Sequence, residues 1–158
     1  LPVSAPEEME QLARRMQVEV VRTKLSPRAM MEVSPDERFH PLFDAVFSLV
    51  CILAHLSREK QPLSQLTAQL PACHMDKTTV FCPWAWKGKV MRKMLEEHKG
   101  QQLELVDGIK VYDAHGWVLI LPDTEHSHVN IISQGVTAES ASTLAALFAR
   151  RIAKFQSR

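Results

Sequence analysis

The stretch from residue 107 to residue 135, DGIKVYDAHGWVLILPDTEHSHVNIISQG, constrains the fold more than any other part of the chain. Its three apolar runs follow the turn signal Asp107-Gly108 and are separated from one another by His115-Gly116 and by the polar turn LPDTEHSH. Short strands joined by such turns predict neighbouring antiparallel strands. The polar turn is also a candidate functional loop, because exposed turns on a rigid scaffold often carry the groups that contact a ligand.

The flanking residues complete a predicted α+β domain over residues 77–158. Residues 78–84 read as a first strand, residues 87–98 as an amphipathic helix, and residues 101–113, 116–122 and 128–135 as three further strands. A helix closes the chain, with an apolar stripe of Leu144, Leu147, Phe148, Ile152 and Phe155. The order β-α-β-β-β-α predicts a four-stranded antiparallel sheet with both helices on one face, so that Trp117, Leu119 and Leu121 share one side of their strand.

Residues 1–71 look like a partial α/β domain. A short helix follows Pro6, a β-branched strand spans Val18 to Thr23, a further helical turn begins at SPRAMMEV, and an exposed loop covers Ser34–Arg38. The segment from Phe43 to Leu56 is apolar around most of its circumference, which predicts a helix buried on several sides. Because these elements make no complete sheet, we expect the isolated chain to leave part of that helix uncovered.

Charge and composition exclude several classes of protein. Nineteen Lys and Arg against eighteen Asp and Glu leave a net charge of +1, too balanced for a nucleic-acid binder. The longest apolar run is shorter than the roughly 20 residues that cross a bilayer. An odd number of cysteines and no signal peptide favour the cytoplasm over a disulfide framework. The chain begins with Leu1 rather than Met, so we expect a fragment of a longer protein.

Two groups of residues contain potential metal ligands. Cys73-His74 with Cys82 lacks a CxxC pair or a second histidine at ligand spacing. His126 and His128 project from the same side of a strand and could share an ion with Asp123 or His115. We interpret the first group as ordinary cysteines and the second as solvated polar residues, and we predict no metal site.

A basic helix face and three tryptophans each allow a functional and a structural interpretation. The face of Lys87, Lys89, Arg92 and Lys93 either meets phosphate or is simply solvated, and we favour solvation. Trp84, Trp86 and Trp117 could stack on a sugar, but Trp117 within GWVLIL is better explained as core.

Several motifs resemble the α-D-phosphohexomutases, which include phosphoglucomutase and phosphomannomutase. VEVVRTKLSPRAMME is similar to a segment of their third domain, and FDAVFSLVCILAHLSREKQPLSQLTAQLP to the helix and connector before their last domain. The stretch from DGIKV to FARRI is similar to that last domain, with its DG-(I/V)-K, GW-(V/I)-L and RPSGTEP motifs. The segments Cys82–Trp84 and Lys87–Met91 resemble the mutase-like module fused behind a sugar-phosphate nucleotidyltransferase, as in mannose-1-phosphate guanylyltransferase fusions.

The resemblance places the candidate phosphate loop of this chain at residues 122–127. Where the family has RPSGTEP, this chain has Leu121 for the Arg, Asp123 for the Ser and Glu125 for the Thr. These exchanges replace attraction to a phosphate dianion with repulsion. We therefore predict a degenerate loop that binds no sugar phosphate. Its residues are Pro122, Asp123, Thr124, Glu125, His126 and Ser127.

The other catalytic parts of the family have no match. The chain contains no phosphoserine loop and no DxDxDR metal run, and VSPDER at residues 33–38 stands where the sugar-recognition GE-x-SGH motif would lie. No catalytic residue or cofactor is expected here, and magnesium is left to a full-length parent. The leading hypothesis is an inactive C-terminal fragment that packs on the missing N-terminal domains of its parent or self-associates. The alternatives are the substrate-closing domain of an active mutase and a stand-alone metal- or protein-binding module.

Overall fold

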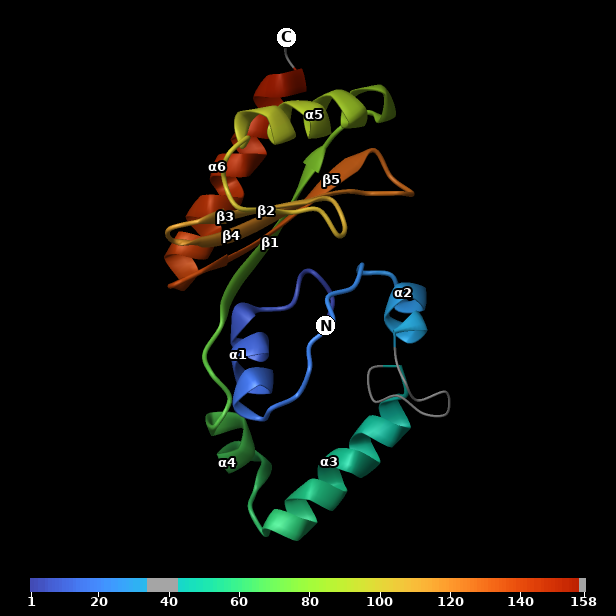
Figure 1. Ribbon diagram of the computed structural model, residues 1–158, viewed down its shortest axis with the longest axis vertical. Coiled ribbons are helices and arrows are strands. Elements are labelled where there is room, and N and C mark those ends of the chain that lie inside the picture. The colour runs from blue at the N-terminus through green and yellow to red at the C-terminus, as the bar shows by residue number, and fades with distance from the viewer. Residues whose placement is uncertain (34–42, 157–158) are drawn as a thin grey trace.

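The computed structural model describes residues 1–33 and 43–156, and its centre is a five-stranded antiparallel sheet (Figure 1). The strands lie in the order β1-β5-β4-β3-β2. Their bounds are His74–Phe81 for β1, Leu103–Glu104 for β2, Ile109–Asp113 for β3, Gly116–Pro122 for β4 and His128–Gly135 for β5. The exposed loop expected at Ser34–Arg38 lies outside the described residues.

The sheet has one strand more than the sequence predicts. The run from residue 101 to 113 divides into β2 and β3, which pair with each other so that Leu103 lies opposite Val111. The chain reverses at Gly108, where φ is +69° and a Cβ would lie 2.2 Å from the carbonyl oxygen of Ile120. Only glycine fits such a position without strain, so the Asp-Gly pair makes a hairpin inside the expected strand.

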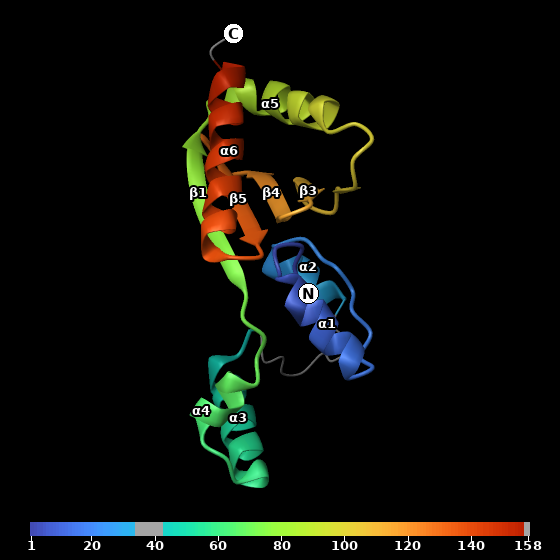
Figure 2. The same cartoon turned by 90° about the vertical axis from the view of Figure 1, so that its left-hand side faces the viewer.

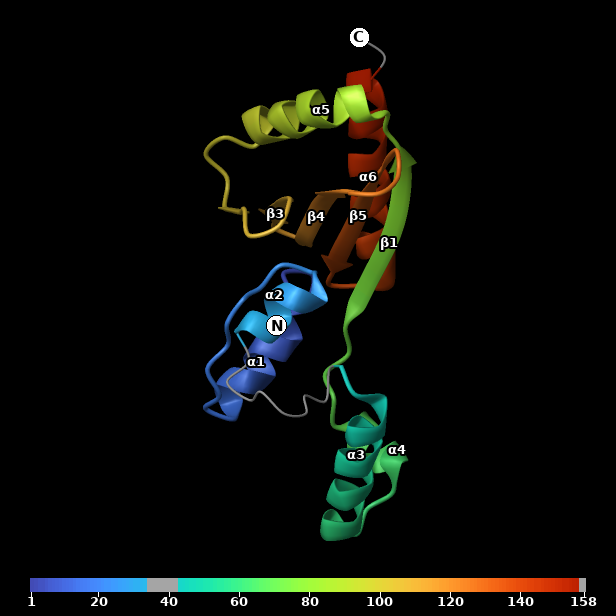
Figure 3. The ribbon, with the colours of Figure 1, turned by 90° about the vertical axis from the view of Figure 1, so that its right-hand side faces the viewer.

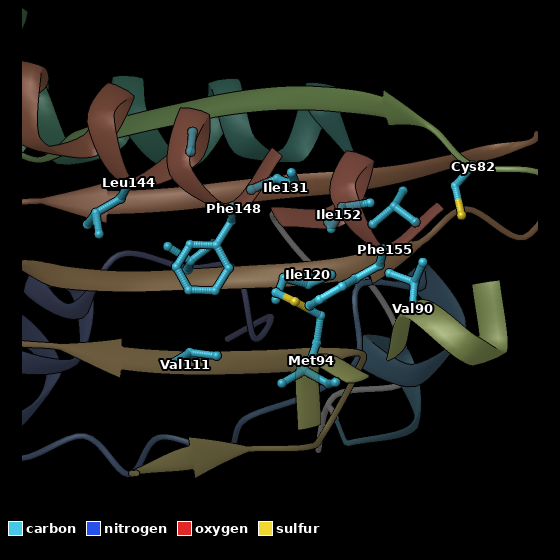
Figure 4. Close-up of a cluster of buried hydrophobic side chains, with 14 residues drawn as sticks. Cys82, Val90, Met94, Val111, Ile120, Ile131, Leu144, Phe148, Ile152 and Phe155 are labelled. Carbon is cyan, nitrogen blue, oxygen red and sulfur yellow. The ribbon is translucent and has the colours of Figure 1, made fainter. Parts of the chain in front are cut away.

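Helices α5 (Trp84–Glu97) and α6 (Ala138–Gln156) cover one face of the sheet, as predicted (Figure 2). Val90 and Met94 of α5 and Phe148 and Ile152 of α6 belong to one buried cluster (Figure 4). From the sheet this cluster takes Ile109, Val111, Val118, Ile120, Val129 and Ile131.

The opposite face of the sheet is covered by residues 1–33. Trp117 and Leu119 lie on that face, where they form a second buried cluster with Val3 and Ile132. Lys110 is fully buried beside them and donates a 3.0 Å hydrogen bond from Nζ to the carbonyl of Val3. The sheet is therefore the middle layer of three, with α1 (Glu7–Arg15) and α2 (Pro27–Glu32) on the side away from α5 and α6 (Figures 1 and 2).

Gln134 of β5 connects the N-terminal segment to the sheet. Its Oε1 accepts hydrogen bonds from the indole N–H of Trp117 at 2.8 Å and from the backbone N–H of Glu7 at 3.0 Å. Its Nε2 donates to Glu8 at 2.6 Å. The strand predicted for residues 18–23 is wrong. The end of this segment instead runs beside the N-terminal residues, where Pro2 and Thr23 form an isolated bridge and Val3 N–H donates to the carbonyl of Thr23 at 2.8 Å.

Helices α3 (Ala45–Glu59) and α4 (Leu63–Ala68) stand apart from the sheet in all three views (Figures 1, 2 and 3). Asp44 caps α3 by accepting the N–H of Phe47 at 2.8 Å, and Lys60 ends it in a left-handed conformation. No residue of α3 is buried, so the burial on several sides that its sequence predicts is absent from this chain. Within residues 1–33 and 43–156, no helix combines the length and the apolar character needed to cross a membrane.

Candidate functional site

The candidate loop connects the ends of β4 and β5. The last pair of the two strands is Pro122 with Val129, and Asp123 N–H donates to the carbonyl of His128 at 3.0 Å. Ser127 accepts the N–H of Cys82 at 2.8 Å, which attaches the loop to the end of β1. The two strands and β1 therefore hold both ends of the predicted loop.

Asp123 folds the loop around its own carboxylate. Its Oδ1 accepts hydrogen bonds from the backbone N–H groups of Glu125 and His126, both at 2.8 Å. Asn130 Nδ2 lies 3.3 Å from Oδ2, and His126 Nδ1 lies 3.3 Å from Oδ1. The two backbone hydrogen bonds hold the pKa of Asp123 well below its usual range. The carboxylate is thus ionised and occupies two backbone donors that an external anion would need.

Lys87 of α5 holds the same loop by hydrogen bonds to its backbone. Its Nζ donates to the carbonyl oxygens of Asp123 at 2.6 Å and His126 at 2.5 Å, and it lies 3.5 Å from the centre of the Trp84 ring. Only 7% of Lys87 is exposed. The expectation that this basic face is solvated is therefore wrong at Lys87. Its ammonium is hydrogen-bonded to the backbone of the loop. The apolar residues next to Lys87 in the sequence of α5 indicate that a lysine at this position can face inward.

A cleft of about 470 Å³ lies between the loop and residues 24–26. The N–H of Leu25 donates to Asp107 at 3.0 Å and sets the N-terminal segment against the β2–β3 turn. Three carboxylates line the cleft, from Asp107, Asp123 and Glu125, against the ammonium of Lys24. Leu121, where the resemblance predicts an arginine, lines it too. The cleft is thus predominantly acidic and favours cations or hydroxyl groups over phosphate.

The histidines proposed as alternative metal ligands are near each other but have other contacts. The ring centroids of His126 and His128 are 6.4 Å apart, and His128 meets Phe81 edge-on at 6.0 Å. His115 precedes β4, at the end of that strand away from Asp123. Among the described residues, no three His, Cys, Asp or Glu side chains gather in an arrangement for a metal ion, and the group of Cys73, His74 and Cys82 is included in that statement.

A second hollow, of about 680 Å³, shares no residue with the loop. It lies between α5 and α6, where Arg151 donates to Nε2 of buried His98 at 3.1 Å and His98 Nδ1 donates to the carbonyl of Met94 at 2.7 Å. Glu96 and Glu97 line it together with the basic residues. Nothing in the sequence pattern indicated this hollow, because its residues come from the ends of two helices far apart in the chain.

No family model matches the chain. Among curated proteins it is 29% identical, over a 163-residue alignment, to a protein of Methanopyrus kandleri named "probable phosphoglucosamine mutase", covering 90% of this chain and 35% of that protein. It is 25% identical over 120 residues to the phosphopentomutase of Thermococcus kodakarensis, covering 70% of this chain and 27% of the relative. The chain therefore spans about a third or less of the length of these relatives.

A crystal structure of a phosphoglucomutase/phosphomannomutase family protein from Burkholderia thailandensis has the same fold. It matches with a TM-score of 0.77 over 98% of this chain and 37% of the other, at 14% sequence identity. At that identity the match concerns the fold alone. The chain is thus similar in sequence to named sugar-phosphate mutases and similar in fold to a phosphoglucomutase/phosphomannomutase family protein.

Proposed function

We propose that the chain is the C-terminal part of a phosphoglucomutase/phosphomannomutase-like protein of sugar-phosphate and sugar-nucleotide metabolism, and that its β4–β5 loop no longer binds the substrate phosphate. The observation that carries this proposal is the carboxylate of Asp123, which accepts the N–H groups of Glu125 and His126. Backbone N–H groups of this kind form cradles for anions. Here the protein supplies the anion itself.

The charges around the loop support the same conclusion. Leu121 has no guanidinium group, and the ammonium of Lys87 donates hydrogen bonds to two carbonyl oxygens of the loop. The carboxylates of the cleft would repel a phosphate dianion, most strongly at low salt, where screening is weakest. In this proposal the chain has a structural or regulatory part in its parent, such as a nucleotidyltransferase–mutase fusion, and a catalytic serine and a magnesium site, if the parent has them, lie outside these 158 residues.

Calorimetric titration of the chain with glucose 1-phosphate and mannose 1-phosphate at low salt tests the proposal. We expect no dissociation constant below about 1 mM for either compound. The double substitution Leu121→Arg with Asp123→Ser frees the two N–H groups and restores the cation, and it should tighten binding. Glu125→Ser is the matched control, since it removes one carboxylate of the loop without touching the hydrogen bonds of Asp123.

Tight binding by the unmodified chain would overturn the proposal. Equal gains from Glu125→Ser and from the double substitution would mean that overall charge, and not the self-occupied backbone, keeps phosphate away. No gain from either variant would indicate that the backbone geometry of the loop has also diverged.

The second candidate is the substrate-closing domain of an active sugar-phosphate mutase, and the feature that favours it is Lys24, whose side chain lines the cleft beside the loop. In that case Lys24 would be the cation that meets the substrate. Mutase assays on the full-length gene product decide between the two. Lys24→Ala would then lower kcat/KM for a sugar phosphate, whereas an upstream sequence with neither a serine loop nor a DxDxDR run would reject this candidate.

A further inference from the structure

The hollow of about 680 Å³ lies between the last turns of α5 and α6 and shares no lining residue with the cleft beside the candidate loop. Its volume is in the range of about 300–1,000 Å³ that is typical of small-molecule sites. Most of the side chains that line it are charged: Lys93, Glu96, Glu97, Arg151 and Lys154. Such a lining suits a polar, charged ligand rather than an apolar one.

Arg151 is fixed by contacts at its guanidinium. Its Nη1 donates a 3.1 Å hydrogen bond to Nε2 of His98, and its guanidinium carbon lies 5.1 Å from the centre of the Phe148 ring. His98 is 3% exposed, donates from Nδ1 to the carbonyl of Met94 at 2.7 Å, and stacks on Phe148 with 5.4 Å between ring centroids. The guanidinium is thus positioned before any ligand arrives, which lowers the entropic cost of binding.

Two cations of the hollow have no carboxylate partner. Within the described part of the chain, neither Lys93 nor Arg151 forms an ion pair, and Nζ of Lys93 lies instead 5.2 Å from the centre of the Phe155 ring. A guanidinium has five N–H donors, arranged in a fork that fits the two oxygens of a carboxylate, and His98 accepts from only one nitrogen of Arg151. The arrangement therefore suits an oxyanion supplied from outside the chain.

The charge of the whole lining favours one negative charge on the ligand over two. Three cations, Lys93, Arg151 and Lys154, against two carboxylates, Glu96 and Glu97, leave the hollow with a net charge of +1. A carboxylate carries a single negative charge at neutral pH, whereas a phosphate monoester carries about −1.5 to −2. The two glutamates would repel a second negative charge but can accept hydrogen bonds from hydroxyl groups.

We propose that this hollow binds a small hydroxylated carboxylate of the sugar-acid class, with its carboxylate on Arg151 and Lys93 and its hydroxyl groups on Glu96 and Glu97. The proposal does not depend on the loss of phosphate binding at the β4–β5 loop, because the two sites share no residue. A phosphate ester is the competing ligand, and the experiments below separate the two.

Titration of the nitrogen-15-labelled 158-residue chain with glucuronate, followed by amide chemical shifts, gives the first test. We expect shifts at residues 96–101 and 150–155, none at residues 123–126, and a dissociation constant of about 1 mM or below. Glucose, which lacks the carboxylate, and propionate, which lacks the hydroxyl groups, should each bind about tenfold more weakly or worse. Inorganic phosphate at equal ionic strength should also bind more weakly than glucuronate.

Two arginines that are adjacent in the sequence provide matched variants. Arg151→Gln removes the guanidinium from the hollow and should weaken glucuronate binding by about tenfold or more, because charge-assisted hydrogen bonds are lost. Arg150→Gln removes the same charge from an exposed position outside the hollow and should change the affinity by less than about twofold, since solvent and salt screen that charge. Lys93→Gln is an independent second variant, on α5, and should also weaken binding. The amide spectrum verifies that each variant keeps its fold.

Three sets of results would overturn the proposal. The first is a glucuronate titration that shifts no amide of the hollow or shifts residues 123–126 instead. The second is unchanged affinity in both Arg151→Gln and Lys93→Gln, or equal weakening by Arg150→Gln and Arg151→Gln, which would reduce the effect to overall charge. The third is propionate or phosphate binding as tightly as glucuronate, which would show that the hollow does not select a hydroxylated carboxylate.

Discussion

Residues 1–33 and helix α3 both carry apolar side chains, but only residues 1–33 pack against the sheet. Residues 1–33 pack against the sheet, where Val3 is fully buried and the polar groups at the contact are paired through Gln134 and Lys110. Helix α3 is more continuously apolar and yet has no buried residue. Hydrophobicity alone therefore does not decide docking. A complementary surface must exist, and the sheet offers one only to residues 1–33.

Substitutions in the two parts should differ most in their effect on unfolding. Phe148→Ala in the core beneath α6 should lower the free energy of unfolding by about 3–5 kcal/mol, because it opens a cavity among buried side chains. Leu49→Ala on α3 should change it by less than about 0.5 kcal/mol in the monomer. Urea denaturation at low protein concentration measures both values. A comparable loss from Leu49→Ala would mean that α3 belongs to the same cooperative unit as the sheet.

The contact between residues 1–33 and the sheet should respond to pH through Lys110. Burial lowers the pKa of Lys110 to about 8. The unfolded chain therefore binds more protons than the folded one between about pH 8 and pH 10, and the free energy of unfolding should rise with pH over that window, by about 2 kcal/mol. The raised pKa of Tyr112 opposes this gain above about pH 10, since the unfolded tyrosine then loses its proton first.

Denaturation at pH 8 and at pH 10 measures the effect, and Lys110→Met is the comparison. This variant keeps the volume of the side chain and removes the titration, so its stability should be nearly flat over the window. An unchanged slope in Lys110→Met would show that another group is responsible.

The sequence predicted the layers of the sheet better than it predicted what covers them. The α6 stripe and the hairpin strands follow from local periodicity, and the structure buries every predicted member of the stripe except Leu147, which is 43% exposed. Residues 117–120 are apolar without alternation, a pattern typical of a strand that is buried on both faces. That signal could have indicated the docking of residues 1–33. It could not name the docked segment, because the contact joins positions more than a hundred residues apart, such as Lys110 and Val3.

The resemblance predicts where the candidate loop lies but not its internal structure. Asp123 in place of Ser indicates a change in charge, whereas the carboxylate also accepts two backbone N–H groups. The sequence does not single out Lys87, because the neighbouring Lys89, Arg92 and Lys93 are typical of a solvated helix face. Which lysine of such a run faces inward depends on where the helix lies against the loop, and that is a property of the tertiary structure.

The hydrogen bonds of Gln134 should stabilise the packing of residues 1–33 on the sheet and should have no effect on α3. Gln134→Ala leaves the indole N–H of Trp117 and the N–H of Glu7 without their acceptor, which should cost about 1–3 kcal/mol in the free energy of unfolding. Gln156→Ala is the matched control, since Gln156 donates one exposed hydrogen bond to the carbonyl of Phe81. Equal losses from the two variants would argue against this role of Gln134.

The smallest expected effect concerns the cap of α3. Asp44→Ala removes the acceptor for the N–H of Phe47 and should weaken the first turn of the helix by about 1 kcal/mol. Because α3 stands apart from the sheet, the change should appear as faster hydrogen exchange at the start of α3, while the exchange of β4 and β5 amides stays the same. Ser26→Ala, which removes the corresponding cap of α2, should instead also loosen Leu25 beside Asp107, since α2 follows a segment docked on the sheet. If Asp44→Ala accelerated exchange in β4, helix α3 would be energetically coupled to the sheet. The absence of buried residues in α3 would then not mean that it unfolds independently.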